Sequence, residues 1–205
     1  MTTTRLLLLR HAEVEESHQH VFGGRIDMDL SPRGHEQAVA LAKFLHGERP
    51  DAIYASPMKR VQQTLAALNG NGSPPPIVLP GLREMDFGEW TGMRWSDITT
   101  RYKVSSSQWL ALLADGAVAG AENEAALRAR VEPCLRQILA EQPGRTVVVA
   151  CHGGIVRMLL GIALALPLRE FGAFEVEYAS VTVLEARGDR NVLKSLNHTP
   201  WRNGK

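Results

Sequence analysis

The stretch LLLLRHAE, residues Leu6 to Glu13, passes directly from an apolar run into charged and polar side chains. A second stretch, VVVACHGG, residues Val147 to Gly154, follows the same pattern and also reaches a histidine at its polar end. Short apolar runs that end in polar or glycine-rich turns are typical of interior strands of a parallel sheet, and such sheets bind ligands at the carboxyl ends of their strands. The two stretches therefore predict one site that contains His11 and His152.

The segment between these stretches predicts an α/β fold. An apolar pattern with helical spacing follows Ser31 and Pro32, which are typical of a helix start. A short strand is expected at residues 52–55, and Ser56 and Pro57 are interpreted as the start of a second helix, with Ser56 as its cap. Alternating strands and helices favour a three-layer α/β/α sandwich with a mainly parallel sheet.

The remaining segments complete this fold. Residues 69–76 are interpreted as the exit from the second helix, and a strand is expected at 77–79. Short helices are expected within 95–114, an amphipathic helix at 122–141 and a further helix at 154–165. Two last strands are expected at 174–185 and 192–196. The chain is interpreted as a single domain over residues 1–205, with residues 88–121 as a lid-like insertion.

Composition excludes several classes of protein. The 205 residues are 44% hydrophobic, and 23 basic against 22 acidic residues leave a net charge of +1, so neither nucleic acid nor an anionic membrane is expected as a partner. The apolar segment at 159–168 is far shorter than the ~20 residues that cross a bilayer. Two cysteines form no disulfide framework, and we expect a soluble, cytoplasmic protein, either a monomer or a homodimer.

Two arginines make the histidine site a candidate phosphate pocket. Arg10 precedes the first histidine, and Arg60 lies in the opening turn of a predicted helix, where an anion would offset its conflict with the helix dipole. The glycines after His152 open another helix, whose free N–H groups favour an anion. A neutral His11 could attack phosphorus while the arginines keep its proton affinity low, and Glu84 could protonate the leaving group.

These residues fall into motifs that resemble a known family. They are Arg10-His11-Ala12-Glu13, Phe22-x-Gly24-x-x-Asp27-x-x-Leu30-Ser31-x-x-Gly34-x-x-Gln37-Ala38, Ser56-Pro57-x-x-Arg60-x-x-x-Thr64, Leu82-x-Glu84-x-x-x-Gly88-x-Trp90 and His152-Gly153-Gly154. In order and spacing the set is similar to the histidine phosphatase superfamily, the phosphoglycerate-mutase-like fold, and within it to α-ribazole and broad-specificity phosphatases.

The resemblance implies a mechanism and a site. His11 would be the phosphorylated nucleophile, Arg10, Arg60 and His152 would bind the phosphoryl group, and Glu84 would be the proton donor. Ser17, Gly24 and Gly153 are also expected to contact the substrate. The family implies neither a metal nor another cofactor. The expected reaction is hydrolysis of a small phosphate monoester of the sugar phosphate, phosphoglycerate or α-ribazole phosphate type, with inorganic phosphate as product.

The sequence departs from the family pattern at several positions. Ala12 replaces the usual glycine after the nucleophile and is expected to narrow the pocket floor. Val14 and Ser17 replace the frequent threonine and asparagine, which removes polar contacts near the phosphate. The frequent Gly-Glu-Ser turn is Ala121-Glu122-Asn123 here, so its role stays open.

Four alternatives use the same residues differently. Cys151 and Arg157 match the Cys-x5-Arg loop of cysteine-based phosphatases, although Met158 follows the arginine where serine or threonine is usual. A phosphoglycerate-type mutase would need an arginine-rich insertion, and residues 101–103 offer only Arg-Tyr-Lys. A non-catalytic module that binds phosphorylated ligands is the third alternative.

His18 and His20, near Glu15 and Glu16, could bind a metal, but a solvated loop is the preferred interpretation.

Three tryptophans, Trp90, Trp95 and Trp109, lie in or beside the predicted lid. They give it an apolar character that would suit a larger or less charged substrate. We expect at least two of them to form the core of the lid.

Overall fold

The computed structural model describes residues 2–68, 72–105, 108–188 and 190–202. Within these ranges six strands form one sheet in the order β3-β2-β4-β1-β5-β6. The strands are β1 (Thr4–Arg10), β2 (Ala52–Ala55), β3 (Pro76–Val78), β4 (Thr146–Cys151), β5 (Val181–Ala186) and β6 (Asn191–His198). The helices are α1 (Pro32–Glu48), α2 (Lys59–Ala66), α3 (Trp95–Tyr102), α4 (Trp109–Ala114), α5 (Glu124–Glu141) and α6 (Gly153–Leu164).

The sheet is mainly parallel. Parallel pairing joins β1 to β4, β4 to β2 and β2 to β3, whereas β5 runs antiparallel to β1 and β6 antiparallel to β5. Arg10 pairs with Cys151, so β1 and β4 end at the same edge. His11 and His152 therefore follow neighbouring strands at one edge, as the sequence predicts.

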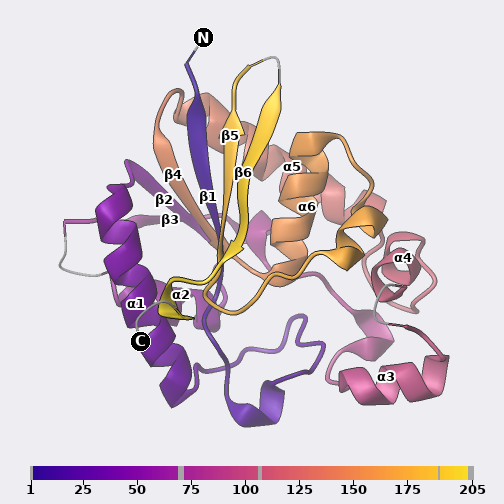
Figure 1. Cartoon of the computed structure of the whole chain (residues 1–205). Coiled ribbons are helices and arrows are strands. Elements are labelled where there is room, and N and C mark those ends of the chain that lie inside the picture. Colours follow the sequence, from indigo (N-terminus) through magenta and orange to yellow (C-terminus); the bar gives the residue numbers. More distant parts are fainter. Residues whose placement is uncertain (1, 69–71, 106–107, 189, 203–205) are drawn as a thin grey trace.

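Helices cover both faces of this sheet (Figure 1). Successive side chains of a strand point to opposite faces. Leu7 and Leu9 accordingly pack with α1 and α2, while Leu6 and Leu8 pack with α5 and α6. Each of these fully buried leucines stabilises the fold by about 1.5–3 kcal/mol. The predicted three-layer α/β/α sandwich is confirmed.

The first two helices begin differently. At α1 the Ser31 hydroxyl accepts a hydrogen bond from the backbone N–H of Gly34 at 2.9 Å, and Pro32 is the first helical residue, as predicted. At α2 the first helical residue is Lys59, and no side chain caps the helix, so the prediction of Ser56 as its cap is wrong. Arg60 nevertheless lies in the first turn of α2.

The last strands also differ from the prediction. The strand expected at 174–185 begins only at Val181, and residues 174–180 form an irregular segment that passes along the carboxyl edge of β1. The predicted exit at 69–76 lies partly outside the described residues. Among those residues, no helix has both the length and the apolar character needed to cross a membrane.

Candidate active site

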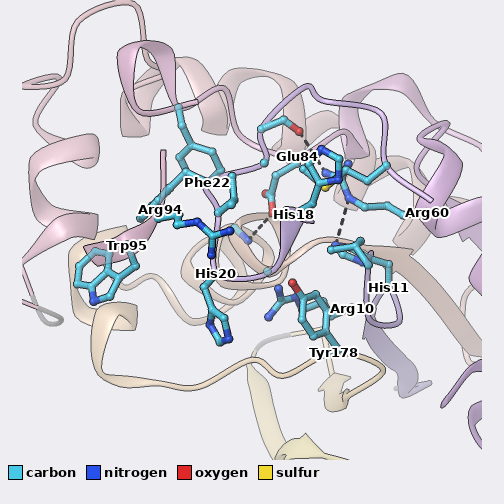
Figure 2. Close-up of a pocket in the computed structure, with 18 of the residues that line it drawn as sticks. Arg10, His11, His18, His20, Phe22, Arg60, Glu84, Arg94, Trp95 and Tyr178 are labelled. Carbon is cyan, nitrogen blue, oxygen red and sulfur yellow. Dashed lines mark hydrogen bonds between the residues drawn. The ribbon is translucent and has the colours of Figure 1, made fainter. Parts of the chain in front are cut away.

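A cavity of about 680 Å³ lies at the carboxyl ends of β1 and β4 (Figure 2). This volume is within the range of about 300–1,000 Å³ that is usual for small-molecule sites. Of the predicted site residues, six line it: Arg10, His11, Gly24, Arg60, Glu84 and Gly153. His152 is buried just behind this lining. Ser17 is exposed and contacts the ring of His18, so the structure does not bring it to the cavity.

His11 has one nitrogen fixed and one available. Its Nδ1 lies 2.8 Å from the carbonyl oxygen of Ala12, and because a carbonyl only accepts, Nδ1 carries the proton. Its Nε2 therefore keeps a lone pair, which accepts a hydrogen bond from Nε of Arg60 at 3.2 Å. Burial, and then the charges of Arg60 and Arg10, hold the pKa of His11 well below its usual value. The ring is thus neutral near pH 7.

Arg60 is a buried cation whose side chain is held without a carboxylate. Its Nη1 donates to the carbonyl of Ile26 at 2.7 Å and its Nη2 to that of Gly24 at 3.1 Å. Its Nε lies 3.2 Å from both His11 Nε2 and His152 Nδ1. Burial lowers the pKa of this guanidinium, which means that its charge is incompletely solvated. An anion in the cavity would stabilise it.

His152 is fully buried and accepts a hydrogen bond from Arg60. Its Nδ1 accepts from Arg60, and its Nε2 therefore carries the proton and donates to the Ser56 hydroxyl at 2.8 Å. Burial, and then the charge of Arg60, hold the pKa of His152 well below its usual value. The rings of His11 and His152 lie 5.2 Å apart. Ser56, interpreted from the sequence as a helix cap, orients this histidine.

Arg10 completes the positive end of the cavity. Its Nη1 donates to the carbonyl of Val176 at 2.6 Å, and its guanidinium lies 4.0 Å from the centre of the Tyr178 ring. Its Nε is buried and has no hydrogen-bond partner among the residues that the structure describes. A buried donor without a partner is unusual, and a ligand oxygen would satisfy it. The sequence does not single out Tyr178, because the pattern of its segment predicts an ordinary strand.

Glu84 faces the same cavity from the segment after β3. Its Oε1 accepts from the backbone N–H of Met85 at 2.9 Å, and its Oε2 from that of Gly154 at 3.4 Å. A Cβ atom on Gly154 would lie 2.6 Å from Oε1 of Glu84, so the glycine is needed for this close approach. The carboxylate is thereby held at the start of α6, beside the two arginines.

Arg130 of α5 fixes the segment that carries Glu84. It donates to the carbonyl of Glu84 at 3.0 Å and to those of Gly81 and Arg83 at 2.7 and 2.8 Å. It also pairs with Glu122 at 2.7 Å, and Glu122 in turn accepts from the backbone N–H of Asp86. Glu122, whose role the sequence left open, therefore helps to position Glu84. No motif identifies Arg130, because its partners are backbone carbonyls.

Two departures from the family pattern, Ala12 and Val14, differ in their effect on the cavity. Ala12 is fully buried in the core formed with α1 and α2 and does not line the cavity, so the expected narrowing of the pocket floor is wrong. Its backbone N–H donates to the Thr64 hydroxyl at 2.9 Å. Val14 does line the cavity and makes part of its wall apolar.

The cysteine-based alternative is wrong. Cys151 is fully buried as the last residue of β4, and burial raises the pKa of its thiol far above the ordinary value. Arg157 faces the cavity, but it donates to the carbonyls of Gly153, Phe171 and Phe174. Burial also lowers the pKa of Arg157 to about 10. A buried thiol that is not ionised at neutral pH is a poor nucleophile.

The metal alternative gains no support. Both His18 and His20 line the cavity, so their segment is part of the cavity wall and not only a solvated loop. His18 contacts Ser17 and, at 3.8 Å, Glu15. In the described part of the chain, no three side chains of histidine, cysteine, aspartate or glutamate are placed to share a metal ion.

The tryptophans divide between core and cavity. Trp90 is 1% exposed and belongs to the main core, whereas Trp95 and Trp109 are half-buried and line the cavity. Phe22 packs against both of these rings, with centroid distances of 5.8 and 5.4 Å. Trp95 and Trp109 also pack against the core that contains Trp90, so these two rings serve both the core and the cavity wall.

Fold and site together define an α/β protein with a histidine and arginine site at the carboxyl edge of its sheet. The family model of the histidine phosphatase superfamily (branch 1) matches residues 6–199. The chain belongs to this superfamily, and the predicted resemblance is confirmed.

Several proteins similar to this chain are phosphatases. Phosphoserine phosphatase 1 of Hydrogenobacter thermophilus is 32% identical over 95% of this chain and 92% of its own length. The adenosylcobalamin/α-ribazole phosphatase of Escherichia coli is 25% identical over 94% of this chain and 95% of its own. A solved mycobacterial glucosyl-3-phosphoglycerate phosphatase in complex with VO3 has a TM-score of 0.85 and 28% identity, covering 95% of this chain and 99% of its own. These relatives agree with the predicted class of enzyme.

Proposed function

We propose that this chain hydrolyses a small phosphate monoester without a metal ion, through a phosphohistidine at His11. One observation carries the proposal: the lone pair of His11 Nε2 lies beside the buried guanidinium of Arg60. A nucleophile and an anion-binding group thus lie next to each other in the cavity. Arg10 adds a second guanidinium, whose buried Nε has no partner within the described part of the chain.

In the first step the substrate phosphate displaces the ring from Arg60. Arg10 and Arg60 bind its oxygens and stabilise the charge that develops during transfer. The lone pair of His11 Nε2 attacks phosphorus, and the bond from phosphorus to the ester oxygen breaks. Glu84, in its protonated form, gives its proton to the departing alkoxide. The products of this step are the alcohol and a phosphohistidine.

In the second step a water molecule attacks the phosphorus. The Glu84 carboxylate accepts a proton from this water, and the bond between phosphorus and Nε2 breaks. Inorganic phosphate leaves, and His11 regains its lone pair. The proton fixed on Nδ1 by Ala12 stays in place throughout, which keeps Nε2 as the reacting atom.

Further residues position this machinery. His152, held by Ser56, fixes the Nε of Arg60 opposite His11. Residues 88–121, which include α3 and α4, act as a lid over the outer part of the cavity within a single domain. This role rests on Trp95 and Trp109, which line the cavity from these two helices.

Turnover of p-nitrophenyl phosphate tests the proposal. The parent chain should hydrolyse it, His11→Ala should abolish turnover, and Cys151→Ser should retain most of it. EDTA should have no effect. Vanadate should compete with the substrate by binding between the arginines; a mycobacterial relative was solved in complex with VO3. Loss of activity in Cys151→Ser but not in His11→Ala, or strong inhibition by EDTA, would refute the proposal.

A further inference from the structure

The cavity contains more positive charge than one phosphoryl group needs. Four arginines line it, Arg10, Arg60, Arg94 and Arg157, whereas Glu84 is its only carboxylate among the described residues. A phosphate monoester carries about 1.5–2 negative charges at pH 7. Arg10 and Arg60, next to His11, match that charge.

The other two arginines differ in how they are held. Arg157 donates to three backbone carbonyls, so each of its three side-chain nitrogens already has a partner. The exposed guanidinium of Arg94 forms neither a hydrogen bond nor an ion pair with any residue that the structure describes. It is thus a free cation at the wall of a cavity.

The backbone around Arg94 is fixed although its side chain is free. Arg94 forms a β-bridge with Val21 and is the residue immediately before α3. On either side, the N–H of Phe22 donates to the carbonyl of Met93 and the N–H of Trp95 to that of His20, each at 3.0 Å. These bonds hold Arg94 at a defined place on the rim, which lowers the entropy cost of using it for binding.

Arg94 and the phosphoryl site lie at opposite ends of the cavity. Figure 2 shows Arg94 extending inward near Phe22 and His20, while His11 and Arg60 lie on the other side. Aromatic rings form the wall on the Arg94 side, and Trp95 is one of them. Such a surface suits the carbon skeleton of a ligand whose two ends are charged.

We propose that Arg94, with His20 beside it, binds a second anionic group of the substrate, either a carboxylate or a second phosphate. This inference rests on the proposed function and narrows its substrate class to phosphate monoesters with a remote negative charge. It reverses the expectation, drawn from the tryptophans, that the lid suits a less charged substrate. An exposed guanidinium that closes on an anion forms a charge-assisted and often bidentate contact.

The test compares two series of synthetic phosphate esters at fixed ionic strength. One series is ω-carboxyalkyl phosphates of increasing length, and the other is alkyl phosphates of the same lengths, whose leaving groups are nearly equivalent. In the parent chain, kcat/KM should favour the carboxylate by about tenfold at one length, which corresponds to about 1.4 kcal/mol. A third series of α,ω-alkanediol bisphosphates shows whether a phosphate is preferred to a carboxylate.

Two variants assign the preference to Arg94. In Arg94→Gln the ratio between the two series should fall to about one, and Arg94→Lys should restore part of it. Arg101→Gln makes the same charge change on α3 outside the cavity lining, and it should keep the parent ratio. Using the ratio cancels any change that is common to both esters.

The outcomes separate this inference from the proposed function. If the parent chain hydrolyses both series equally well at every length, or if Arg94→Gln keeps the preference, the second-anion site is refuted while the hydrolase function stands. A preference for bisphosphates that is lost in Arg94→Gln supports the site and assigns a phosphate to it. If none of the esters is hydrolysed, the proposed function fails and this inference with it.

Discussion

The Nε of Arg60 donates a hydrogen bond to Nε2 of His11 at 3.2 Å, so a cation lies directly in front of the nitrogen that would attack phosphorus. This contact keeps Nε2 unprotonated and holds its lone pair toward the guanidinium in the cavity. It also means that an incoming phosphate meets the guanidinium and the nucleophile together. The chemistry proposed for this protein depends on this pair.

The ionisation of His11 is the first consequence to test. Burial and the charges of Arg60 and Arg10 lower its pKa, so the ring should stay neutral as the pH falls through 6.5 and gain a proton only at lower pH. Ring 15N NMR should show this directly. Arg10→Gln should raise the pKa of His11, whereas Arg101→Gln, far from the ring in sequence and outside the cavity lining, should not. A His11 that titrates at or above pH 6.5 would contradict the structure.

The same pKa shift predicts how stability depends on pH. Because the pKa of His11 and that of His152 are lowered in the folded state, the unfolded chain binds more protons below pH 6.5. The free energy of unfolding should therefore fall as the pH decreases from 7 to 5. Urea unfolding at a series of pH values measures it, and the slope should be smaller in His152→Gln. An unchanged slope in that variant would argue against a neutral, buried His152.

Glu84→Gln should distinguish good leaving groups from poor ones. A general acid contributes about 10²–10⁴-fold where the leaving group needs a proton, so kcat/KM for alkyl phosphates should fall by about that factor. This ratio reports the steps up to the phosphohistidine and leaves out its hydrolysis, in which Glu84 serves every substrate alike. The loss for p-nitrophenyl phosphate should be much smaller, because p-nitrophenolate needs little protonation. Equal losses for both substrates would mean that Glu84 binds rather than protonates.

Arg130→Met tests whether the segment that carries Glu84 is positioned from α5. The change removes hydrogen bonds to three carbonyls, including that of Glu84, and should lower kcat/KM for alkyl phosphates by about 10- to 100-fold. p-Nitrophenyl phosphate should again be less affected, which a general loss of folding would not produce. Arg128→Met is the control, because among the described residues Arg128 pairs with Glu124 and Glu132 alone, both on its own helix. If both variants behave alike, Arg130 has no positioning role.

Local sequence patterns were sufficient to predict the fold and the centre of the site. The apolar runs that end at Arg10 and Cys151 define adjacent parallel strands, because buried strands of this kind have few alternative arrangements. Arg10, His11, Arg60 and Glu84 line one cavity, although they come from segments far apart in the sequence.

The supporting residues could not be predicted because their partners are distant and carry no sequence signal. Arg130 and Arg157 bind backbone carbonyls, which every residue has. Tyr178 lies in an irregular segment whose apolar pattern resembles a strand. Ser56 is a residue type typical of helix caps, but in the folded chain its hydroxyl forms a hydrogen bond with His152. In each case a tertiary contact overrides the local pattern.

The central claim is that phosphorus is transferred to His11, and trapping the intermediate tests it most directly. The parent chain should be mixed with an excess of p-nitrophenyl phosphate, quenched in alkali within the first turnover, digested and analysed by mass spectrometry. The account predicts a phosphoryl group on His11 that is stable in alkali and lost in acid, and none in His11→Ala. A phosphoryl group on Cys151 or another residue, or turnover in His11→Ala at the parent rate, would contradict it.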